Sequence, residues 1–444
     1  MGLIVNPIIP IYRDRELAFI LADANTNLIF IPTMFRDFDY TQMLQRLRGD
    51  LPELRHIVTV RDCDQTSASA TLEYAALVQR GCTLPLTPAV VDPNSVKIIL
   101  YTSGTTGRAK AVQHSHNTLT RALDNSIEAW QVGADDVMLM PSPVTHITGF
   151  VNGIELPFFS DARSALMERW NVQLAIDYIQ RVQATLCVSA TPFLQELAQT
   201  AEQQKIALPS LRMFACGGAA VAPDLINHVH RVLPNCRASR VYGSTEVPLV
   251  TVGFQQLEQA QLGAETDGRI HNYSVRVVDD DNCELPLGRD GELLVRGAAM
   301  MLGYGDAEQT REALSADGFF YTGDIGHITA DGAIVITDRK KDIIIRGGEN
   351  LSAKEIEDVL HGHASIHEVA VVSMPHLRLG EGVCAFAILR EGCTELTLAE
   401  LQPFLQQAGL ARQKWPERIE VCAELPRTAS GKIRKDQLRA QLRG

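Results

Sequence analysis

The sequence predicts an α/β protein with a large N-terminal domain, a β-rich subdomain within it and a small α+β C-terminal domain. From residue 16 onward, short β-branched runs alternate with stretches of helical spacing, which is typical of a mostly parallel sheet covered by helices. After Gly268 the pattern changes to short strands and turns, which predicts the β-rich subdomain at about 268–337. A charged run at 338–342 then separates two strands. We therefore expect the large domain to cover 1–337 and a mobile C-terminal domain to cover 338–444.

The elements of the large domain follow from the spacing of apolar residues. Short β-branched or apolar runs predict strands at 28–31, 56–60, 96–101, 137–140, 185–189 and 211–215. Apolar positions at helical spacing predict helices at 119–130, 174–182, 193–201 and 225–232. Because open parallel sheets bind ligands beyond the carboxyl ends of their strands, we expect the functional site at that edge.

The later part of the chain has shorter elements. Strands are predicted at 273–278 and 291–296, with an acidic turn at 279–282 after the first. Strands at 333–337 and 343–346 flank the charged run. Ser352 and Glu355 have the spacing of a capping box, which predicts a helix over 353–360.

Charge and composition exclude several classes of protein. The 444 residues include 41 Lys and Arg against 53 Asp and Glu, which gives a formal net charge of −12. Because nucleic-acid binders usually carry a basic face, this balance excludes DNA or RNA as the expected partner. Apolar residues at 45% and charged residues at 21% are typical of an ordinary globular protein rather than a disordered or collagen-like chain.

The sequence shows neither a membrane-spanning or secretory segment nor a pattern of paired cysteines. No apolar run reaches the ~18 residues of a membrane-spanning helix, and no positive segment precedes the apolar N-terminus as in a secretory signal. The nine cysteines are scattered without a Cys-x-x-Cys pair, which indicates reduced thiols. We therefore expect a cytoplasmic protein with no transmembrane segment, and we leave open whether it is a homo-oligomer.

The most specific motif is the segment Tyr101-Thr-Ser-Gly-Thr-Thr-Gly-Arg-Ala-Lys110, between an apolar strand and a helix. Its glycines let backbone N–H groups turn toward an anion, while its hydroxyls and lysine are suited to phosphate oxygens. The spacing Gly104-x-x-Gly107-x-x-Lys110 differs from that of a Walker A loop, which disfavours an ordinary P-loop ATPase. The alternative is a surface loop of Gly, Ser and Thr, which ten consecutive matching residues disfavour.

Three further segments carry polar groups suited to a nucleotide. Tyr242-Gly-Ser-Thr-Glu246 offers an aromatic face, hydroxyls and a carboxylate suited to Mg²⁺, although a turn before a helix would have similar residues. Tyr321-Thr-Gly-Asp324 ends in a carboxylate that suits ribose hydroxyls. The alternative interpretation of this motif is an ordinary turn without a functional role. The segment 426–435 contains Lys432 in a glycine loop, for which a basic tail is the alternative.

Together and in this order, these motifs resemble the adenylate-forming superfamily, which includes acyl-CoA synthetases, firefly-type luciferases and peptide-synthetase adenylation domains. The resemblance runs from about residue 3 to the end of the chain. It implies an enzyme that uses ATP, Mg²⁺ and coenzyme A with a small carboxylic acid, and a hinge at Lys341. The nucleotide-binding residues that it implies are Thr102, Ser103, Gly104, Thr105, Thr106, Gly107 and Lys110 at the phosphates, Gly217, Gly218, Ala219, Tyr242 and Gly243 at adenine, and Asp324 and Arg339 at the ribose.

The same resemblance implies four catalytic residues. Lys432 would reach the α-phosphate and the carboxylate, Thr245 would contact phosphate, and Glu246 would bind Mg²⁺. A lysine suits that place, because a carboxylate attacking the α-phosphorus brings two anions together and a positioned ammonium stabilises them. His146 resembles a residue that lines and gates the acyl pocket, whereas an isolated histidine is more often packed or exposed.

Gly347 and Gly348, in Arg346-Gly-Gly-Glu349, resemble the family's coenzyme A segment. Two glycines let a backbone approach the narrow pantetheine arm closely. This segment favours a CoA ligase. The segments expected to line the acyl pocket offer no basic partner for a second carboxylate, which favours a fatty, alicyclic or aromatic acid as the substrate. Two alternatives stay open, namely a relative that binds nucleotide or acyl groups without turnover, and adenylation for an acceptor other than CoA.

The beginning of the chain departs from the family pattern. Residues 2–17 resemble an interior segment of the family, and the phosphate-loop motif comes as early as Tyr101. We therefore expect the N-terminal part of the large domain to be absent.

Overall fold

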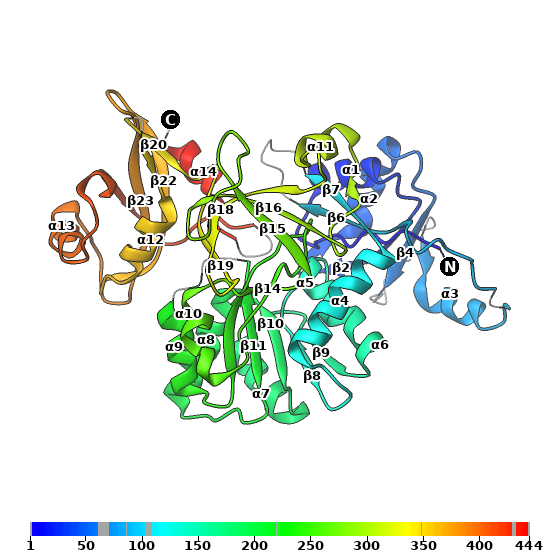
Figure 1. Cartoon of the computed structure of the whole chain (residues 1–444). Helices are drawn as coiled ribbons and strands as arrows, with labels where there is room; N and C mark the ends of the chain where they lie inside the picture. The colour runs from blue at the N-terminus through cyan, green and yellow to red at the C-terminus, as the bar shows by residue number, and fades with distance from the viewer. Residues whose placement is uncertain are drawn as a thin grey trace. The chain divides into compact units, whose positions relative to one another are not determined.

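The computed structural model describes residues 2–60, 71–85, 87–102, 109–218, 221, 223–347, 349–428 and 432–442. The residues form two compact units, one of Met1–Thr118 with Met301–Thr310 and one of Leu119–Met300 with Arg311–Gly444. The predicted α/β class is confirmed, with a parallel sheet and a β-rich region in the second unit (Figure 1). Within the described ranges, no helix combines the length and the apolar character needed to cross a bilayer.

The first unit has a core formed mainly by α1 and α2 against a parallel strand pair. Leu17 and Leu21 of α1 and Met43 and Leu44 of α2 are buried there, with Ile31 of β1. Helices α4 (His116–Trp130) and α11 (Ala307–Ala313) begin in this unit and continue into the second. The other elements of the first unit are α1 (Asp14–Asp23), β1 (Leu28–Pro32), β2 (Met34–Phe35), β3 (Phe38–Asp39), α2 (Tyr40–Leu47), β4 (His56–Val60), β5 (Leu72–Glu73), α3 (Tyr74–Gly81), β6 (Val96–Thr102), β7 (Lys110–Ser115) and β17 (Gly303–Tyr304).

The strand predicted at 96–101 exists as β6, and it lies outside the large parallel sheet. β6 pairs antiparallel with β7, and β17 pairs antiparallel with β7 on the other side. The connection 103–109 is too short for a parallel crossover, which needs a dozen or more residues. The phosphate-loop motif therefore joins two strands of a hairpin instead of leading directly from a strand to a helix.

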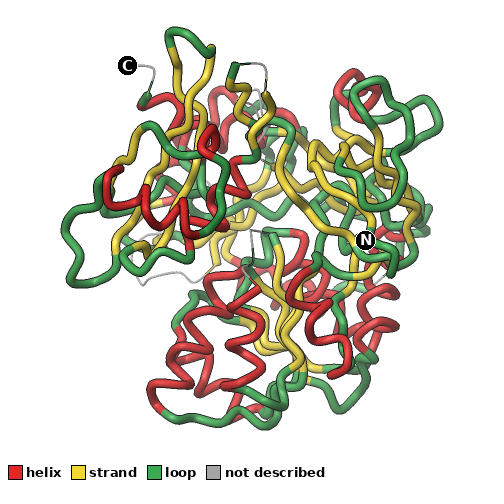
Figure 2. The backbone as a smooth tube through the Cα atoms, turned by 60° about the vertical axis from the view of Figure 1, so that its left-hand side comes forward, coloured by secondary structure: helices red, strands yellow, loops and turns green. Residues whose placement is uncertain are grey.

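The second unit contains the predicted parallel sheet, with strands in the order β12-β11-β10-β8-β9. All four pairings are parallel, and helices lie on both faces of the sheet (Figures 1 and 2). Most side chains of the sheet are fully buried, as expected for strands covered on both faces. The elements are β8 (Val137–Met140), α5 (Ile147–Gly149), a π-helical turn (Phe150–Glu155), α6 (Leu156–Ser160), β9 (Arg163–Leu166), α7 (Val172–Val182), β10 (Leu186–Ser189), α8 (Thr191–Gln204), β11 (Met213–Gly217), α9 (Pro223–Val232), β12 (Arg237–Val241) and α10 (Ala260–Glu265).

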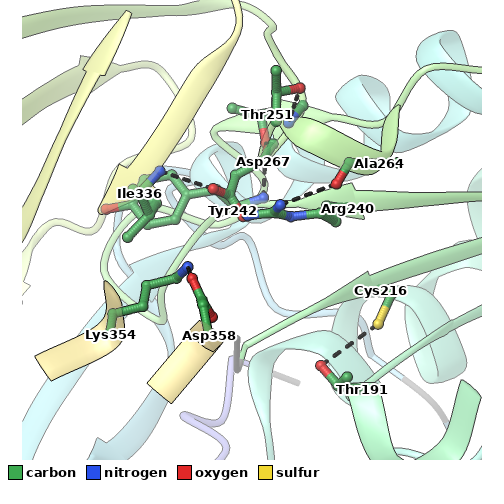
Figure 3. A network of polar contacts seen from close by, with 12 residues as sticks. Thr191, Cys216, Arg240, Tyr242, Thr251, Ala264, Asp267, Ile336, Lys354 and Asp358 are labelled. Carbon is green, nitrogen blue, oxygen red and sulfur yellow. Dashed lines mark hydrogen bonds and ion pairs between the residues drawn. The ribbon is translucent and has the colours of Figure 1, made fainter. Parts of the chain in front are cut away.

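The β-rich region is an antiparallel sheet of β15 (Tyr273–Val278), β16 (Gly291–Gly297), β18 (Phe320–Ile328) and β19 (Ile334–Arg339). A buried ion pair links it to β12, since the Arg240 guanidinium lies 2.6 Å from Oδ1 of Asp267 (Figure 3). Oδ2 of Asp267 accepts a hydrogen bond from the Ile336 N–H at 2.8 Å, and Arg240 also donates to the Ala264 carbonyl at 3.1 Å. The strands β13 (Thr251–Val252) and β14 (Arg269–Ile270) form a short antiparallel pair. The Thr251 hydroxyl of β13 donates a hydrogen bond to the Asp267 carbonyl. Asp267 thus ties together three segments that are far apart in the chain.

The C-terminal part has its own sheet and core. Its elements are β20 (Ile344–Arg346), β21 (Glu349–Leu351), α12 (Ala353–His361), β22 (Ile366–His376), β23 (Gly380–Leu389), α13 (Leu398–Gln407), β24 (Arg418–Val421) and α14 (Lys435–Gln441). α12 begins as predicted, because the Ser352 hydroxyl accepts from the Glu355 N–H at 3.0 Å. Glu355 does not complete the expected capping box: its carboxylate accepts from Lys414 at 2.6 Å, and the Ser352 hydroxyl donates to the Thr337 carbonyl.

The Asp267 pair generates a stability prediction. Asp267→Ala leaves the Arg240 guanidinium buried without its carboxylate, so we expect the free energy of unfolding to fall by about 3–5 kcal/mol. Asp358→Ala is the control, since it removes the exposed pair with Lys354 that Figure 3 also shows and costs about 0.5 kcal/mol. Urea unfolding followed by fluorescence measures both, and equal losses for the two variants would contradict the assignment.

Candidate active site

Polar side chains gather at the carboxyl ends of the parallel strands. The Ser142 hydroxyl, just after β8, lies 3.0 Å from the Ser189 hydroxyl at the end of β10, and both residues are buried. The Cys216 thiol of β11 lies 3.7 Å from the Thr191 hydroxyl, at the start of α8 (Figure 3). From the sequence, the segments that hold Ser189, Thr191 and Cys216 were expected to border the acyl pocket or adenine. Neither contact was predicted, because single Ser and Thr residues after short strands are common. The signal that was available is their common position at the edge where open α/β sheets bind ligands.

Two glycines at the end of β11 allow close approach of the backbone. A Cβ at Gly217 would lie 2.4 Å from the Val241 carbonyl oxygen of the neighbouring strand. Gly218 has a φ of +81°, and a Cβ there would lie 3.9 Å from Cε of Lys432. A larger residue at either position would therefore disturb the strand pair or enter the space beside Lys432. Ala219 lies outside the described residues.

A shared carboxylate in the middle of β18 connects the end of β12 with the end of β19. Oδ2 of Asp324 accepts from the Tyr242 hydroxyl at 2.7 Å, and its Oδ1 accepts from Nε of Arg339 at 2.6 Å. Asp324 is buried, whereas the Arg339 side chain is 44% exposed. Burial, followed by the charge of Asp324, raises the pKa of Tyr242, and the same carboxylate raises the pKa of Arg339. Tyr242 therefore stays a neutral donor and Arg339 stays charged.

The segment after β12 turns sharply back on itself. A Cβ at Gly243 would lie 2.6 Å from the Leu249 nitrogen, so the turn requires glycine there. Thr245 is buried in this turn and Glu246 is partly exposed. The Glu246 carboxylate is close enough to Lys432 to stabilise its ammonium electrostatically.

Lys432 lies in a loop that the neighbouring residues close. Arg427 and Ile433 form an antiparallel bridge, and the Lys432 carbonyl accepts from the Thr428 N–H at 2.7 Å. The residue retains exposed surface, yet protein atoms around the ammonium displace its hydration and lower its pKa. The positive charge of Arg339 acts in the same direction, and the Asp324 and Glu246 carboxylates oppose it. The structure thus brings Lys432 together with Gly218, Glu246, Asp324 and Arg339.

His146 faces the same ammonium from the loop before α5. Its Nδ1 accepts from the Thr148 N–H at 3.4 Å, so the ring caps the short helix. Burial of the ring, followed by the positive charge of Lys432, lowers the pKa of His146 to about 4. The imidazole is therefore neutral near pH 7.

The first unit holds the ends of the phosphate-loop motif. Thr102 of β6 pairs with Lys110 of β7 in the antiparallel register. The Lys110 ammonium lies 4.7 Å above the centre of the Tyr304 ring, a cation–π contact that orients it. Ser103, Gly104, Thr105, Thr106 and Gly107 lie outside the described residues.

Gly347 lies in the turn between β20 and β21. Its φ is +60°, which a glycine adopts without strain, and its N–H donates to the Leu379 carbonyl at 2.8 Å. Gly348 lies outside the described residues. Among the residues that are described, no three His, Cys, Asp or Glu side chains form a cluster that could hold a metal ion.

Comparison with known proteins identifies the family of the chain. Residues 1–305 match the family model for the AMP-binding enzymes, and residues 355–432 match the model for the C-terminal domain of these enzymes. The chain is 34% identical to a medium-chain fatty-acid–CoA ligase of Escherichia coli strain K12, over 100% of this chain and 77% of the relative. It is 29% identical to a 2,3-dihydroxybenzoate–AMP ligase of Bacillus subtilis strain 168, over 97% of this chain and 78% of the relative.

A solved structure has the same fold. The crystal structure of ATP-bound MatB from Rhodopseudomonas palustris matches with a TM-score of 0.84 and 26% sequence identity, over 99% of this chain and 83% of that one. The first family model covers the phosphate-loop motif and the segment from Tyr242 to Glu246, and the second reaches Lys432. The chain therefore belongs to the AMP-binding enzyme family of adenylate-forming ligases.

Proposed function

We propose that the chain is an ATP-dependent carboxylic acid:CoA ligase, which forms an acyl-adenylate and pyrophosphate and then transfers the acyl group to CoA. The observation that carries the proposal is the position of Lys432 beside Gly218, Glu246, Asp324 and Arg339. An ammonium beside two carboxylates and a guanidinium, at the carboxyl edge of a parallel sheet, suits a nucleotide whose α-phosphate is attacked there.

The nucleotide would be held by residues with distinct roles. The Asp324 carboxylate, fixed by Tyr242 and Arg339, suits the ribose hydroxyls. Gly217, Gly218, Ala219, Tyr242 and Gly243 would border adenine, and Thr245 would contact phosphate. The phosphate-loop residues are assigned to the phosphates by the family resemblance, namely Thr102, Ser103, Gly104, Thr105, Thr106, Gly107 and Lys110.

Glu246 is the carboxylate we assign to Mg²⁺. One carboxylate suits this ion, because Mg²⁺ at nucleotide sites usually keeps waters and binds substrate phosphates beside one or two carboxylates. The ion would neutralise charge on the phosphates.

In the first reaction, an oxygen of the substrate carboxylate attacks the α-phosphorus of ATP, and the bond to the pyrophosphate oxygen breaks. Lys432 would donate to the carboxylate and to an α-phosphate oxygen, where negative charge concentrates as the new bond forms. His146 is neutral at pH 7, so it adds no further positive charge beside Lys432 and Arg339. It would line the entrance for the acid as a polar but uncharged group.

In the second reaction, the CoA thiolate attacks the acyl carbon and AMP leaves. We assign Gly347 and Gly348 to the pantetheine arm and Lys341 to the hinge between a large domain of 1–337 and a C-terminal domain of 338–444. A rotation of the C-terminal domain about this hinge would move Lys432 out of the site after the first reaction and bring Gly347 and Gly348 into it. We place the enzyme in the cytoplasm, where ATP and CoA are available.

The substrate acid would have an uncharged fatty, alicyclic or aromatic tail. Ile147, Phe150 and Val151 are buried apolar residues directly after His146, and Met140 packs at the same edge of the sheet. An apolar lining suits a tail without charge, since a second carboxylate would need a counter-charge to offset its desolvation. Transfer to an acceptor other than CoA, and nucleotide binding without turnover, are the two alternatives that the experiment distinguishes.

The first prediction on activity concerns Lys432. Purified enzyme with ATP, Mg²⁺, CoA and a panel of fatty, alicyclic and aromatic acids is expected to release AMP only with the right acid. Lys432→Ala should lower the rate of adenylation by about 10²-fold or more, because it removes a donor aimed at developing charge. Arg434→Ala, two residues away and paired with Asp436 at an exposed site, is the matched control and should retain activity.

Each outcome of this assay has a distinct meaning. AMP release that needs the acid and yields acyl-CoA supports the ligase. Acid-dependent exchange of pyrophosphate into ATP, without thioester, would favour another acceptor. ATP binding with no exchange for any acid would overturn the proposal in favour of a non-catalytic relative.

A further prediction concerns the protonation of His146. Its pKa is lowered in the folded state, so the unfolded chain binds more protons between pH 6.5 and about 4, and the folded state loses stability as pH falls through that range. His146→Gln cannot titrate, so we expect its loss of stability from pH 7.5 to pH 5 to be smaller than that of the wild type by about 1–2 kcal/mol. Urea unfolding at the two pH values measures this, and identical losses would show that His146 is not the responsible group.

A further inference from the structure

Helix α14 follows the Lys432 loop directly and carries two basic residues that face a cluster of buried acids. Lys435 is the first residue of α14, and Arg439 lies one turn later on the same side. The acids come from the end of β19, from the segment that follows it and from α12. They are Asp338, Asp342 and Glu357, which are all less than a tenth exposed.

Lys435 is the centre of this cluster. Its ammonium lies 2.8 Å from Oε1 of Glu357, in a pair whose side chains are 17% and 11% exposed. The same Glu357 oxygen accepts from the Val371 N–H at 2.6 Å, which fixes the carboxylate against β22. Burial alone would lower the pKa of Lys435, but Glu357 and Asp342 raise it, so the lysine is charged.

Arg439 fastens the other end of the helix to the segment between the large and C-terminal parts. Its guanidinium donates to the Lys341 carbonyl at 3.2 Å and forms an ion pair with Asp342. The Arg439 and Asp342 side chains are 17% and 10% exposed. Both Lys341 and Asp342 belong to the charged run that follows β19, so this contact joins α14 to the proposed hinge.

The covalent chain transmits this anchoring to Lys432. Only two residues separate Lys432 from Lys435, and the loop is already closed by the bridge between Arg427 and Ile433. Displacing the start of α14 would therefore displace Lys432 relative to Gly218 and Asp324. Misplacement of a reacting group by about 1 Å can cost ~10²-fold in rate.

We propose that Lys435 and Arg439 are positioning residues, which fix α14 to Glu357 and to the hinge segment 341–342 and thereby hold Lys432 at the site of adenylation. This inference rests on the proposed function and adds to it a device that acts on the first reaction alone. The second reaction does not need Lys432 at that place, so it is insensitive to the loss of either contact.

The experiment compares the two half-reactions in variants of Lys435. Lys435→Met keeps the length of the side chain and removes its charge, and Lys435→Arg keeps the charge. We expect Lys435→Met to lower acid-dependent pyrophosphate exchange by about 10- to 100-fold, through kcat and not through KM for ATP. Formation of acyl-CoA from added acyl-adenylate should change less than about twofold, and Lys435→Arg should restore most of the exchange rate.

The control removes an ion pair made by α12, the helix that also carries Glu357. Lys414→Met breaks the pair with Glu355 on α12, whose side chains are 24% and 45% exposed, and should leave both half-reactions within about twofold of the wild type. A loss of both half-reactions in Lys435→Met, or a loss that Lys414→Met shares, would show a general structural role and overturn the inference.

A second readout is independent of turnover. ATP is expected to protect Lys432 of the wild type from acetylation by a limiting reagent, measured by mass spectrometry relative to Lys205. In Lys435→Met this protection should be lost while ATP still binds. If the wild type shows no exchange with any acid, the proposed function fails, and unchanged protection of Lys432 in Lys435→Met would then overturn the positioning role separately.

Discussion

The Asp324 carboxylate is the group on which the geometry of the candidate site depends. It accepts one hydrogen bond from Tyr242 and one from Arg339, so a single buried side chain of β18 fixes the ends of β12 and β19 relative to each other. Asp324 and Arg339 are also partners in the antiparallel register of β18 and β19, which holds them opposite each other through the backbone as well. A carboxylate held from two sides loses little further freedom when it binds a ligand, and this favours recognition of a pair of hydroxyls.

The charges around Lys432 nearly balance, and this balance suits the proposed chemistry. Arg339, Lys341 and Lys432 lie near Asp324 and Glu246, so the site without ligands has only a small excess of positive charge. Loss of hydration lowers the pKa of Lys432, so a further anion near the ammonium would stabilise its charged form. A substrate carboxylate and an α-phosphate supply such anions. His146 contributes no competing positive charge, because its neutral form is favoured by the same burial and by Lys432 itself.

Sequence periodicity predicted most elements, because local pattern and tertiary position agree in this fold. The strands expected at 56–60, 137–140 and 273–278 have the same bounds as β4, β8 and β15. The parallel sheet followed from the alternation of strands and helices, and the motif residues described around Lys432 do come together. The pairing of β6 was missed because apolar runs report burial and not the direction of the neighbouring strand.

The polar contacts that were missed are those made between distant segments. Glu355 has capping-box spacing but pairs with Lys414, 59 residues away, because a full ammonium is a stronger partner than a single backbone N–H. The Ser142–Ser189 pair depends on two strands that are neighbours in the sheet and 47 residues apart in sequence. The acids around Lys435 come from three separate segments, and each one taken alone has the pattern of an ordinary surface charge.

The cluster at α14 also explains why buried charges are retained so near the end of the chain. An apolar replacement of the pair Lys435 and Glu357 would pack as well and avoid the cost of desolvating two ions. Ion pairs differ from apolar contacts in requiring a defined geometry, because a small displacement leaves a buried charge without its partner. At the junction between Lys432 and the hinge segment, such a contact permits one arrangement of the helix and penalises neighbouring ones. In the proposed mechanism, a C-terminal domain would bring Lys432 to the α-phosphorus and then withdraw it, and such a movement would require discrete arrangements of this kind.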